Sequence, residues 1–579
     1  MMPWTLYRYI FWDLCKLTVL AAAVLCTVVA IALAIRPLAE GLLEPLDLLR
    51  FVMYSMPTLV GFILPFAGAF AATLVFCRMT ADNEVLAASV SGISYRGILV
   101  PVLVLGLLIG GGLWTMSNWL MPYFYRGAAA LVQRDVASML VRQIGRNEPV
   151  QMAGYVIYAD RAVERETIPQ RDEPHQPTQW MLLDGLVVGQ FDRETGDLRS
   201  EYTAAEANLL FYDIDGEPWL TVQLRDAEMY RPARGEIAFG REVPLEWAID
   251  RPFRDRPDFY TPRQLAEIER EPEKFSTVAE RRRGLERAIA TERLLEGMQR
   301  QLAQRTLRLH TGEPTPAPGV DLGPPAEAEE AAPDPAERGW LEARVDYLIR
   351  SPGIEREGSR LLLRGDEEQP VRIDQRREGS LERQWYADEA VLEVSRGMPG
   401  EEPRVEIRLV ERVRVIDWPE GLQTRQRATI LGSARWTESL LPRIRARSTE
   451  DLLDTAERDH RDGEAVAGAA AGLRRELRWL SLRIASLQHT RGALAMAGVL
   501  VLLLGAVLAM HGRHRTPLVV YLGSFLAALA TIVLVNAGQS YAHNVEMEYA
   551  LTLGLPLIWS GNIVLVVVIA AAYMRLSRH

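Results

Sequence analysis

Residues 492–510 read GALAMAGVLVLLLGAVLAM, an apolar stretch with no charged side chain. A helix needs about 20 such residues to cross the hydrocarbon core of a bilayer. Six stretches of comparable length would be very unusual as buried helices of a soluble protein, so we predict six transmembrane helices. The other five stretches without Asp, Glu, Lys or Arg are Leu17–Ile35, Phe51–Cys77, Gly97–Met121, Thr516–Ala542 and Tyr549–Met574.

The first of these stretches has small residues at Ala30, Ala32 and Ala34, the spacing of a secretory cleavage site. Its apolar part is longer than the roughly 7–15 residues of a signal-peptide core. We therefore expect an uncleaved first span.

Charged residues are concentrated between the third and fourth apolar stretches. The formal net charge of −10 therefore belongs to a soluble domain in the middle of the chain. We expect no nucleic-acid partner. Only Lys16 and Lys274 are lysines. Cys15, Cys26 and Cys77 all lie in or beside predicted spans, so the soluble domain has no disulfide framework.

Basic residues in short loops set the orientation of membrane proteins, with the more basic side in the cytoplasm. The loops on the side of the N-terminus are basic, whereas Arg36 and Arg50 on the other side have acidic neighbours. We predict cytoplasmic termini and an external central domain, which lies in the periplasm of a bacterium with two membranes. The basic residues on the cytoplasmic side are Arg8, Lys16, Arg78, Arg96, Arg513, Arg515, Arg575 and Arg578.

The central domain divides into β-rich and helical parts. Alternating apolar and polar residues within 125–260 and 346–448 predict strands. Between them, 261–309 is helical with leucines every seven residues, a weak coiled-coil pattern, and 312–336 is a Pro/Ala/Glu-rich linker. The predicted domains are 1–124 (spans one to three), 125–260 (β), 261–345 (helical insert and linker), 346–448 (β), 449–488 (helical return) and 489–579 (spans four to six).

The two β regions share a sequence pattern. Tyr202-Thr-Ala-Ala-Glu-Ala is echoed by Tyr386-Ala-Asp-Glu-Ala, and a turn containing Gly, Glu and Pro follows each. Thr261-Pro-Arg-Gln and Thr449-Glu-Asp-Leu then both look like helix N-caps. A tandem duplication would explain this sequence similarity. The alternative is that strand–turn–strand patterns resemble each other by chance.

An amphipathic helix is predicted before the fourth span, with apolar residues at three- and four-residue steps from Leu473 to Leu487. Its other face is basic and has two interpretations. It is a solvated face, or it contacts anionic lipid head groups. The basic residues are Arg474, Arg475, Arg478 and Arg483.

Sequence signatures of catalysis are missing. Neither lysine belongs to a P-loop, the eight histidines form no His-Glu-x-x-His pair, and no Gly-x-Ser-x-Gly occurs. The six apolar stretches contain no ionisable carboxylate or base, which argues against ion-coupled transport. We expect no catalytic residue, no metal and no cofactor, so another subunit would supply the energy for transport.

Several motifs resemble the lipopolysaccharide-transport permease family LptF/LptG (YjgP/YjgQ). They are Leu6-Tyr-Arg-Tyr-Ile before the first span, Met56-Pro57 and Leu64-Pro65-Phe66 in the second, Arg78–Ser94 after it, and Gly554-Leu-Pro with Trp559-Ser-Gly-Asn in the sixth. The resemblance implies a polytopic α-helical inner-membrane protein with six transmembrane helices, 3+3, around a periplasmic β-jellyroll domain.

The resemblance also implies partners. Two such permeases pair, and a separate ABC-type ATPase dimer binds from the cytoplasm. Lipid passes to the periplasmic side and on to a lipid-bridge protein. The segment 78–94 would be the helix that couples to the ATPase, with Arg78, Glu84 and Gly92 as its key positions. Glu84 offers a carboxylate to a basic partner, and Gly92 ends the helix.

Lipid contact in the family involves basic residues at the outer ends of the spans. Arg36 and Arg50 have such positions, where they would bind lipid phosphates or simply snorkel to the interface. Arg483 is a further candidate. Spans one and five would form a lateral gate.

The central domain departs from the family pattern, because it exceeds 350 residues and the family has a single β-jellyroll. The leading hypothesis is a permease subunit without ATPase activity of its own that exports lipopolysaccharide or a related lipid. One alternative is a permease of a lipoprotein-release-type ABC system, which has fewer spans. Another is a membrane-anchored periplasmic scaffold without transport activity.

Overall fold

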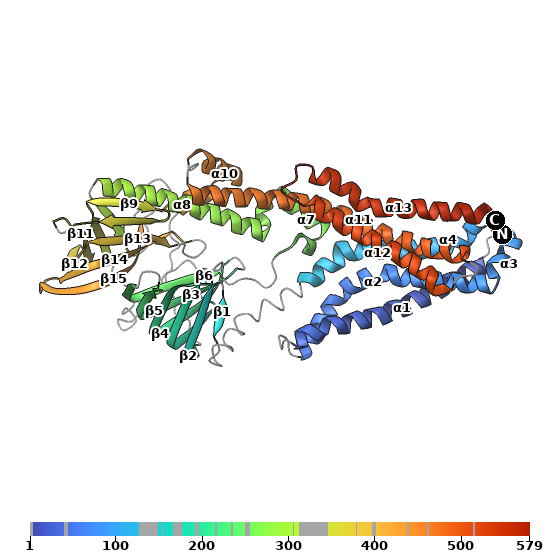
Figure 1. The fold of residues 1–579 in the computed structure, drawn as a ribbon, viewed down its shortest axis with the longest axis horizontal. Helices are drawn as coiled ribbons and strands as arrows, with labels where there is room; N and C mark the ends of the chain where they lie inside the picture. Colours follow the sequence, from blue (N-terminus) through green and yellow to red (C-terminus); the bar gives the residue numbers. More distant parts are fainter. Residues whose placement is uncertain are drawn as a thin grey trace, which may run out of the picture. The chain divides into compact units, whose positions relative to one another are not determined.

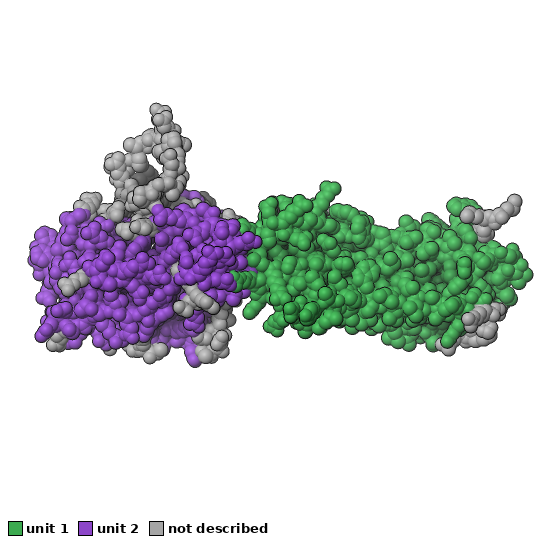
Figure 2. Space-filling model, turned by 90° about the horizontal axis from the view of Figure 1, so that it is seen from above, with its two compact units in different colours: residues 1–133, 253–279, 474–579 green, residues 134–252, 280–473 purple. Residues whose placement is uncertain are grey.

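The computed structural model forms two compact units (Figure 2). Unit 1 comprises residues 1–133, 253–279 and 474–579, and unit 2 comprises 134–252 and 280–473. The structure describes residues 4–39, 45–126, 149–152, 154–165, 176–191, 196–214, 217–232, 236–248, 255–304, 306–311, 345–366, 368–377, 379–395, 401–436, 439–459, 463–512 and 516–578.

Six helices are long and apolar enough to cross a membrane, which confirms the prediction from the charge-free stretches. The third continues from α4 (Tyr95–Thr115) through a short π-helix, η1 (Met116–Leu120), to Arg126. The amphipathic segment and the fourth span form one continuous helix of 48 residues, α11 (Glu464–His511). The others are α1 (Trp4–Ala39), α2 (Pro45–Ala81), α12 (Pro517–Ala542) and α13 (Ala550–Arg578).

Small residues let α11 approach α2 and α4 closely. A Cβ at Gly110 of α4 would lie 3.0 Å from the carbonyl oxygen of Ala495, and one at Gly505 of α11 would lie 3.0 Å from that of Ala69. Such contacts are typical of helices that associate within a membrane. The apolar part of α11 is accordingly the most buried of the six, whereas α1, α12 and α13 leave most of theirs uncovered.

Unit 2 holds the β-rich part of the chain (Figure 1). Its described strands are hydrogen-bonded in the order β1-β2-β3-β4-β5-β6-β15-β7-β8-β11-β12-β14-β13-β10-β9, and β14 also pairs with β15. The first six are β1 (Val150–Met152), β2 (Tyr155–Arg165), β3 (Gln179–Phe191), β4 (Leu198–Ile214), β5 (Glu217–Arg231) and β6 (Glu236–Ala248). The next are β7 (Leu307–His310), β8 (Val345–Arg350), β9 (Gly353–Glu357), β10 (Arg360–Arg364) and β11 (Val371–Arg377). The last are β12 (Ser380–Ala387), β13 (Glu389–Ser395), β14 (Arg404–Asp417) and β15 (Leu422–Trp436).

The strands β1 to β6 form an antiparallel meander in which each strand pairs with the next along the chain. Alternate side chains, such as Leu183 and Val222, are fully buried in one core. A short parallel contact of Thr429 and Ile430 in β15 with β6 joins this meander to the later strands.

Six later strands close into a barrel. β7, β8, β11, β12, β14 and β15 each pair with the next in this order, and β15 pairs back with β7. Apolar side chains fill the core, and Leu295 and Leu302 of α8 (Ser276–Ala303) belong to the same core. Leu309, the next leucine of the seven-residue pattern, lies in β7. The pattern therefore reflects packing against the barrel and not a coiled coil.

Some element boundaries differ from the predicted ones. β7 precedes the predicted linker, so the second β region begins at Leu307 and not at residue 346. Thr261 caps α7 (Pro262–Arg270) as predicted, whereas Ser448 and not Thr449 caps α10 (Thr449–Arg458). The linker 312–336 lies outside the described residues. The remaining short elements are α3 (Glu84–Val90), η3 (Pro257–Phe259), η4 (Pro272–Lys274) and α9 (Leu441–Arg445).

Two hairpins in unit 2 have similar layouts, β4 with β5 and β12–β13 with β14. In each, the pairing is interrupted beside residues of positive φ, which are Asp226 in β5 and Glu411 with Arg412 in β14. Only the interruption in β14 shifts the strand register, so only β14 has a β-bulge there, which bends the strand. Tyr202 and Tyr386 lie on matching sides of the two interruptions. Descent from one duplicated unit stays a prediction.

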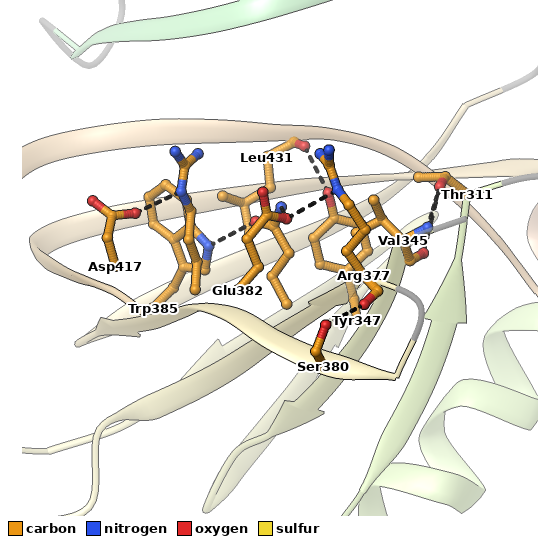
Figure 3. A network of polar contacts seen from close by, with 11 residues as sticks. Thr311, Val345, Tyr347, Arg377, Ser380, Glu382, Trp385, Asp417 and Leu431 are labelled. Carbon is orange, nitrogen blue, oxygen red and sulfur yellow. Dashed lines mark hydrogen bonds and ion pairs between the residues drawn. The ribbon is translucent and has the colours of Figure 1, made fainter. Parts of the chain in front are cut away.

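Polar contacts run across β11, β12 and β14 of the barrel (Figure 3). The indole N–H of Trp385 donates to Oε1 of Gln375 at 3.2 Å, and the Gln375 amide donates to Glu382 at 3.2 Å. Arg383 forms an ion pair with Asp417 at 2.6 Å. These contacts satisfy polar side chains beside an apolar interior and help to fix the register of the three strands.

Candidate functional site

Arg78, in the last turn of α2, binds two side chains of α1. Its Nη2 donates to Oδ2 of Asp13 at 2.6 Å and to the hydroxyl of Tyr9 at 3.0 Å. The guanidinium is therefore already paired within the chain. Arg78 sets the position of the helix end that leads into α3.

α3 is a seven-residue helix with two different faces. Val85 and Ala88 are buried in the core that also contains side chains of α1, α2 and α4. Leu86 and Val90 are 46% and 82% exposed. These two residues are four positions apart, so they lie on one side of the helix and form an apolar contact surface suited to a groove.

Glu84 is the first residue of α3 and is half-buried. Its Oε2 atom is buried and has no hydrogen-bond partner among the described residues. A buried acceptor without a donor costs free energy. Glu84 therefore has an unsatisfied acceptor oxygen at the start of this helix.

Gly92 follows the end of α3 in a left-handed conformation, with φ of +84°. The Ile93 N–H donates to the carbonyl of Ala88 at 3.1 Å, the bond that defines a Schellman turn. Ser94 then caps α4 by accepting a hydrogen bond from the Gly97 N–H at 3.3 Å. Both ends of the connection between α3 and α4 are thus fixed by hydrogen bonds.

Replacing Gly92 by valine should loosen the end of α3. The left-handed conformation costs an ordinary L-residue about 1–2 kcal/mol, and a β-branched residue tolerates it worst. Nothing lies within 4 Å of the added Cβ, so backbone strain is the whole effect. We expect faster amide hydrogen exchange over 84–93 in Gly92→Val, and near-normal exchange in Gly92→Asn. Unchanged exchange in the valine variant would contradict this account.

A buried arginine stands at the other end of the helices, just before the charge-free part of α11. Nη2 of Arg491 donates to the carbonyl oxygens of Asp258 at 3.2 Å and Tyr260 at 3.1 Å. Its Nη1 lies 3.4 Å from Oδ1 of Asn118 in η1. The residue is 6% exposed. Hydrogen bonds from a charged donor are strong, so Arg491 holds this loop against both helices.

Arg483, earlier on α11, forms an ion pair with Asp258 at 3.0 Å. This is a third arrangement, besides the solvated face and the lipid contact that the sequence left open. The side chains of Arg36 and Arg50 lie outside the described part of the structure, so their lipid contacts stay predictions.

Arg126, at the end of the third span, binds the same loop. Its Nε donates to the carbonyl of Phe259 at 3.2 Å, its guanidinium also binds Gln264, and its Cζ lies 5.5 Å from the ring centre of Tyr260. Tyr260 donates its hydroxyl to Asp255 at 2.6 Å, and burial together with this hydrogen bond raises the pKa of Tyr260. We call the residues that hold this loop the loop clamp: Asn118, Arg126, Arg483 and Arg491, with 255–264.

Aromatic side chains surround the end of the third span near the loop clamp. Trp114, Trp119 and Tyr123 are 48%, 48% and 74% exposed. Trp and Tyr concentrate where a bilayer meets water, which indicates that this helix end lies at a membrane surface. An apolar hollow of about 590 Å³ there is lined by Gly112, Thr115, Met116, Trp119, Leu120 and Tyr123.

Of the loop clamp, the sequence pointed only to Arg483, as a lipid contact, and to Thr261, as a helix N-cap. Arg491 is the last charge before a charge-free stretch, which was a usable signal, but its carbonyl acceptors at 258 and 260 have no sequence signature. Asp13, the partner of Arg78, was missed as well. Within the described ranges, no group of His, Cys, Asp or Glu is arranged to hold a metal ion.

Comparison with protein families matches residues 8–290 to the family described as "Lipopolysaccharide export system permease LptF/LptG". No curated protein matches the chain. The matched part contains the first three spans, α3 and β1 to β6, and it ends within α8. The barrel, Arg483 and Arg491 lie beyond it.

Proposed function

Because this chain belongs, through residues 8–290, to the LptF/LptG family of lipopolysaccharide export permeases, we propose that it takes its lipid from the inner membrane in an ATP-driven export complex. The lipid is lipopolysaccharide or a related molecule, which a periplasmic β domain receives. The chain is a transport subunit with several membrane spans, and ATP hydrolysis falls to a separate ATPase dimer.

The two-faced helix α3 is the observation that carries the proposal. Its buried face makes it part of the core of α1, α2 and α4, and Leu86 and Val90 offer the ATPase an apolar contact from the cytoplasm. The pair of Arg78 with Asp13 joins the same region to α1. A movement of α3 driven by the ATPase would therefore displace α1, α2 and α4 together.

The loop clamp supports transmission at the periplasmic end. Residues 255–264 follow β6 in the chain, and Arg126 and Arg491 attach them to the third and fourth spans. A relative movement of these spans would displace 255–264, the segment that follows β6 along the chain.

The remaining partners follow from the same proposal. The termini are cytoplasmic, the three-plus-three spans flank a periplasmic jellyroll-like domain, and a lipid-bridge protein takes the lipid onward. α1 and α12 would form the lateral gate with a second permease. The large uncovered apolar surfaces of both helices support this, because such surfaces face lipid or another helix in a membrane.

Purification of the full-length chain from its native membrane tests the proposal. We expect an ABC-type ATPase to co-purify, identified by peptide mass spectrometry, and lipopolysaccharide to be recovered by lipid extraction. A periplasmic scaffold without transport activity would co-purify with neither the ATPase nor lipopolysaccharide. If neither is recovered, the proposal is wrong.

A charge reversal at Glu84 tests the site of coupling. Glu84→Arg should lower the amount of co-purified ATPase by at least about tenfold, because like charges across an interface cost several kcal/mol. Glu84→Gln has the same size and serves as the control, with a smaller loss expected. Full ATPase recovery with Glu84→Arg would contradict coupling through this end of α3.

A further inference from the structure

A row of basic side chains crosses five strands of the barrel. Read across β8, β11, β12, β14 and β15, it consists of Arg350, Arg372, Tyr386, Arg414 and Arg425, each directly opposite the next. Residues paired in this way project from one face of a sheet. That face is the outer one, because the sequence neighbours of the row fill the barrel core, among them Ile373, Trp385 and Val415. We call this set the arginine row.

The arginine row carries uncompensated positive charge. Like charges directly opposite each other destabilise a sheet, and Arg350 with Arg372 and Arg414 with Arg425 are two such pairs. Asp374 binds Arg372 at 2.8 Å. The other three arginines are exposed and form no ion pair with the residues that the structure describes. Because the whole chain has a net charge of −10, the row is a local basic site on an acidic protein.

Tyr386 holds the central arginines in place. Cζ of Arg372 and Cζ of Arg414 lie 5.9 Å and 6.0 Å from the centre of its ring. The Tyr386 hydroxyl donates to Gln384 at 3.4 Å, and Gln384 donates to Asp374 at 3.1 Å. Side chains that are ordered in advance lose less entropy when a ligand binds. The centre of the row is therefore ordered before an anion binds.

We propose that the arginine row binds the phosphate groups of the exported glycolipid on the outer face of the barrel. Guanidinium groups bind phosphate through paired hydrogen bonds. Measured along the curved barrel wall, with about 4.8 Å between strands, the row extends about 19 Å, so different parts of it can engage different phosphates. The inference rests on the proposed function for the identity of the lipid. It goes beyond it, because the row lies outside the matched residues 8–290.

A nucleic acid fits this surface less well. Proteins that bind single strands stack bases on open aromatic rings. The ring of Tyr386 is instead flanked by two guanidinium groups. This arrangement favours phosphate groups over bases.

Binding of lipopolysaccharide to the full-length protein in detergent tests the proposal. The variant combines Arg414→Gln with Arg425→Gln, and neither arginine has an ion pair to lose among the described residues. The control combines Arg270→Gln with Arg443→Gln, which removes the same charge from exposed arginines outside the barrel strands. Four probes are used: intact lipopolysaccharide, phosphatase-treated lipopolysaccharide, inorganic pyrophosphate and a single-stranded oligonucleotide.

We expect the row variant to bind intact lipopolysaccharide about tenfold more weakly, because it loses charge-assisted hydrogen bonds. The control should change affinity less than about twofold, since exposed unpaired arginines contribute little. With phosphatase-treated lipid, the row variant and the wild type should bind alike. Pyrophosphate should bind the wild type more weakly than the intact lipid does.

Several results would overturn the proposal. If the wild type binds treated and untreated lipid equally, the arginine row does not bind the lipid phosphates. The proposed function is unaffected by that result. Equal losses in the variant and the control show only a general charge effect. Pyrophosphate or a single-stranded oligonucleotide that binds more tightly than the lipid assigns the row to another ligand. Failure to bind either form of lipid overturns the proposed function as well.

Discussion

Replacing Val90 by aspartate is expected to remove the ATPase from the purified protein while leaving the fold intact. Val90 is 82% exposed, so the free energy of unfolding should change by less than about 0.5 kcal/mol. In the complex, a carboxylate would enter an apolar contact. Losing a central contact of this kind costs about 2–4 kcal/mol, which weakens binding roughly 30- to 1000-fold. The amount of co-purified ATPase measures the effect.

The control for Val90→Asp is Leu422→Asp in β15. Leu422 is 59% exposed and also lies outside the membrane spans. Its replacement adds the same charge to another exposed apolar position, so ATPase recovery should not change. Equal losses from the two variants, or a Val90→Asp protein that keeps its ATPase, would show that α3 is not the contact surface.

Replacing Arg491 by methionine is expected to release the loop clamp. The change leaves the carbonyls of Asp258 and Tyr260 and the amide oxygen of Asn118 without this donor. Leaving a buried acceptor without its donor costs about 1–3 kcal/mol. We expect a clear fall in the Tm of the detergent-solubilised protein and faster proteolysis within residues 255–264.

Arg475→Met is the matched control, because Arg475 is an exposed arginine on the same helix. Its effect on stability should stay within about 0.5 kcal/mol. An Arg491→Met protein with the wild-type Tm and proteolysis pattern would mean that the loop is held by other contacts. Loss of lipid export without loss of stability would instead point to a role in transmission alone.

The membrane helices could be predicted because the signal is local. Each span is recognised as a charge-free stretch, and this requires no knowledge of contacts with other parts of the chain. Gly92 could be predicted for the same reason, since a left-handed turn after a short helix needs glycine at that position. The exposed face of α3 required the structure, because sequence does not say which side of a short helix the bundle covers.

Long-range contacts could not be predicted. Arg491 binds carbonyls more than 200 positions earlier in the chain, and any residue type has a carbonyl. β7 has four residues, and its partner β8 begins only at Val345. The arginine row becomes visible only when strand register places Arg350 and Arg425 in one line.

The two ends of the strand order in unit 2 have a consequence for solubility. β1 has three residues, and the exposed strand β9 reads Gly-Ile-Glu-Arg-Glu. Short and charged edge strands are poor templates for a strand from another molecule. The barrel ring also buries its own edges by closing. The protein can therefore concentrate many strands in one domain at the cell envelope without seeding intermolecular β aggregation.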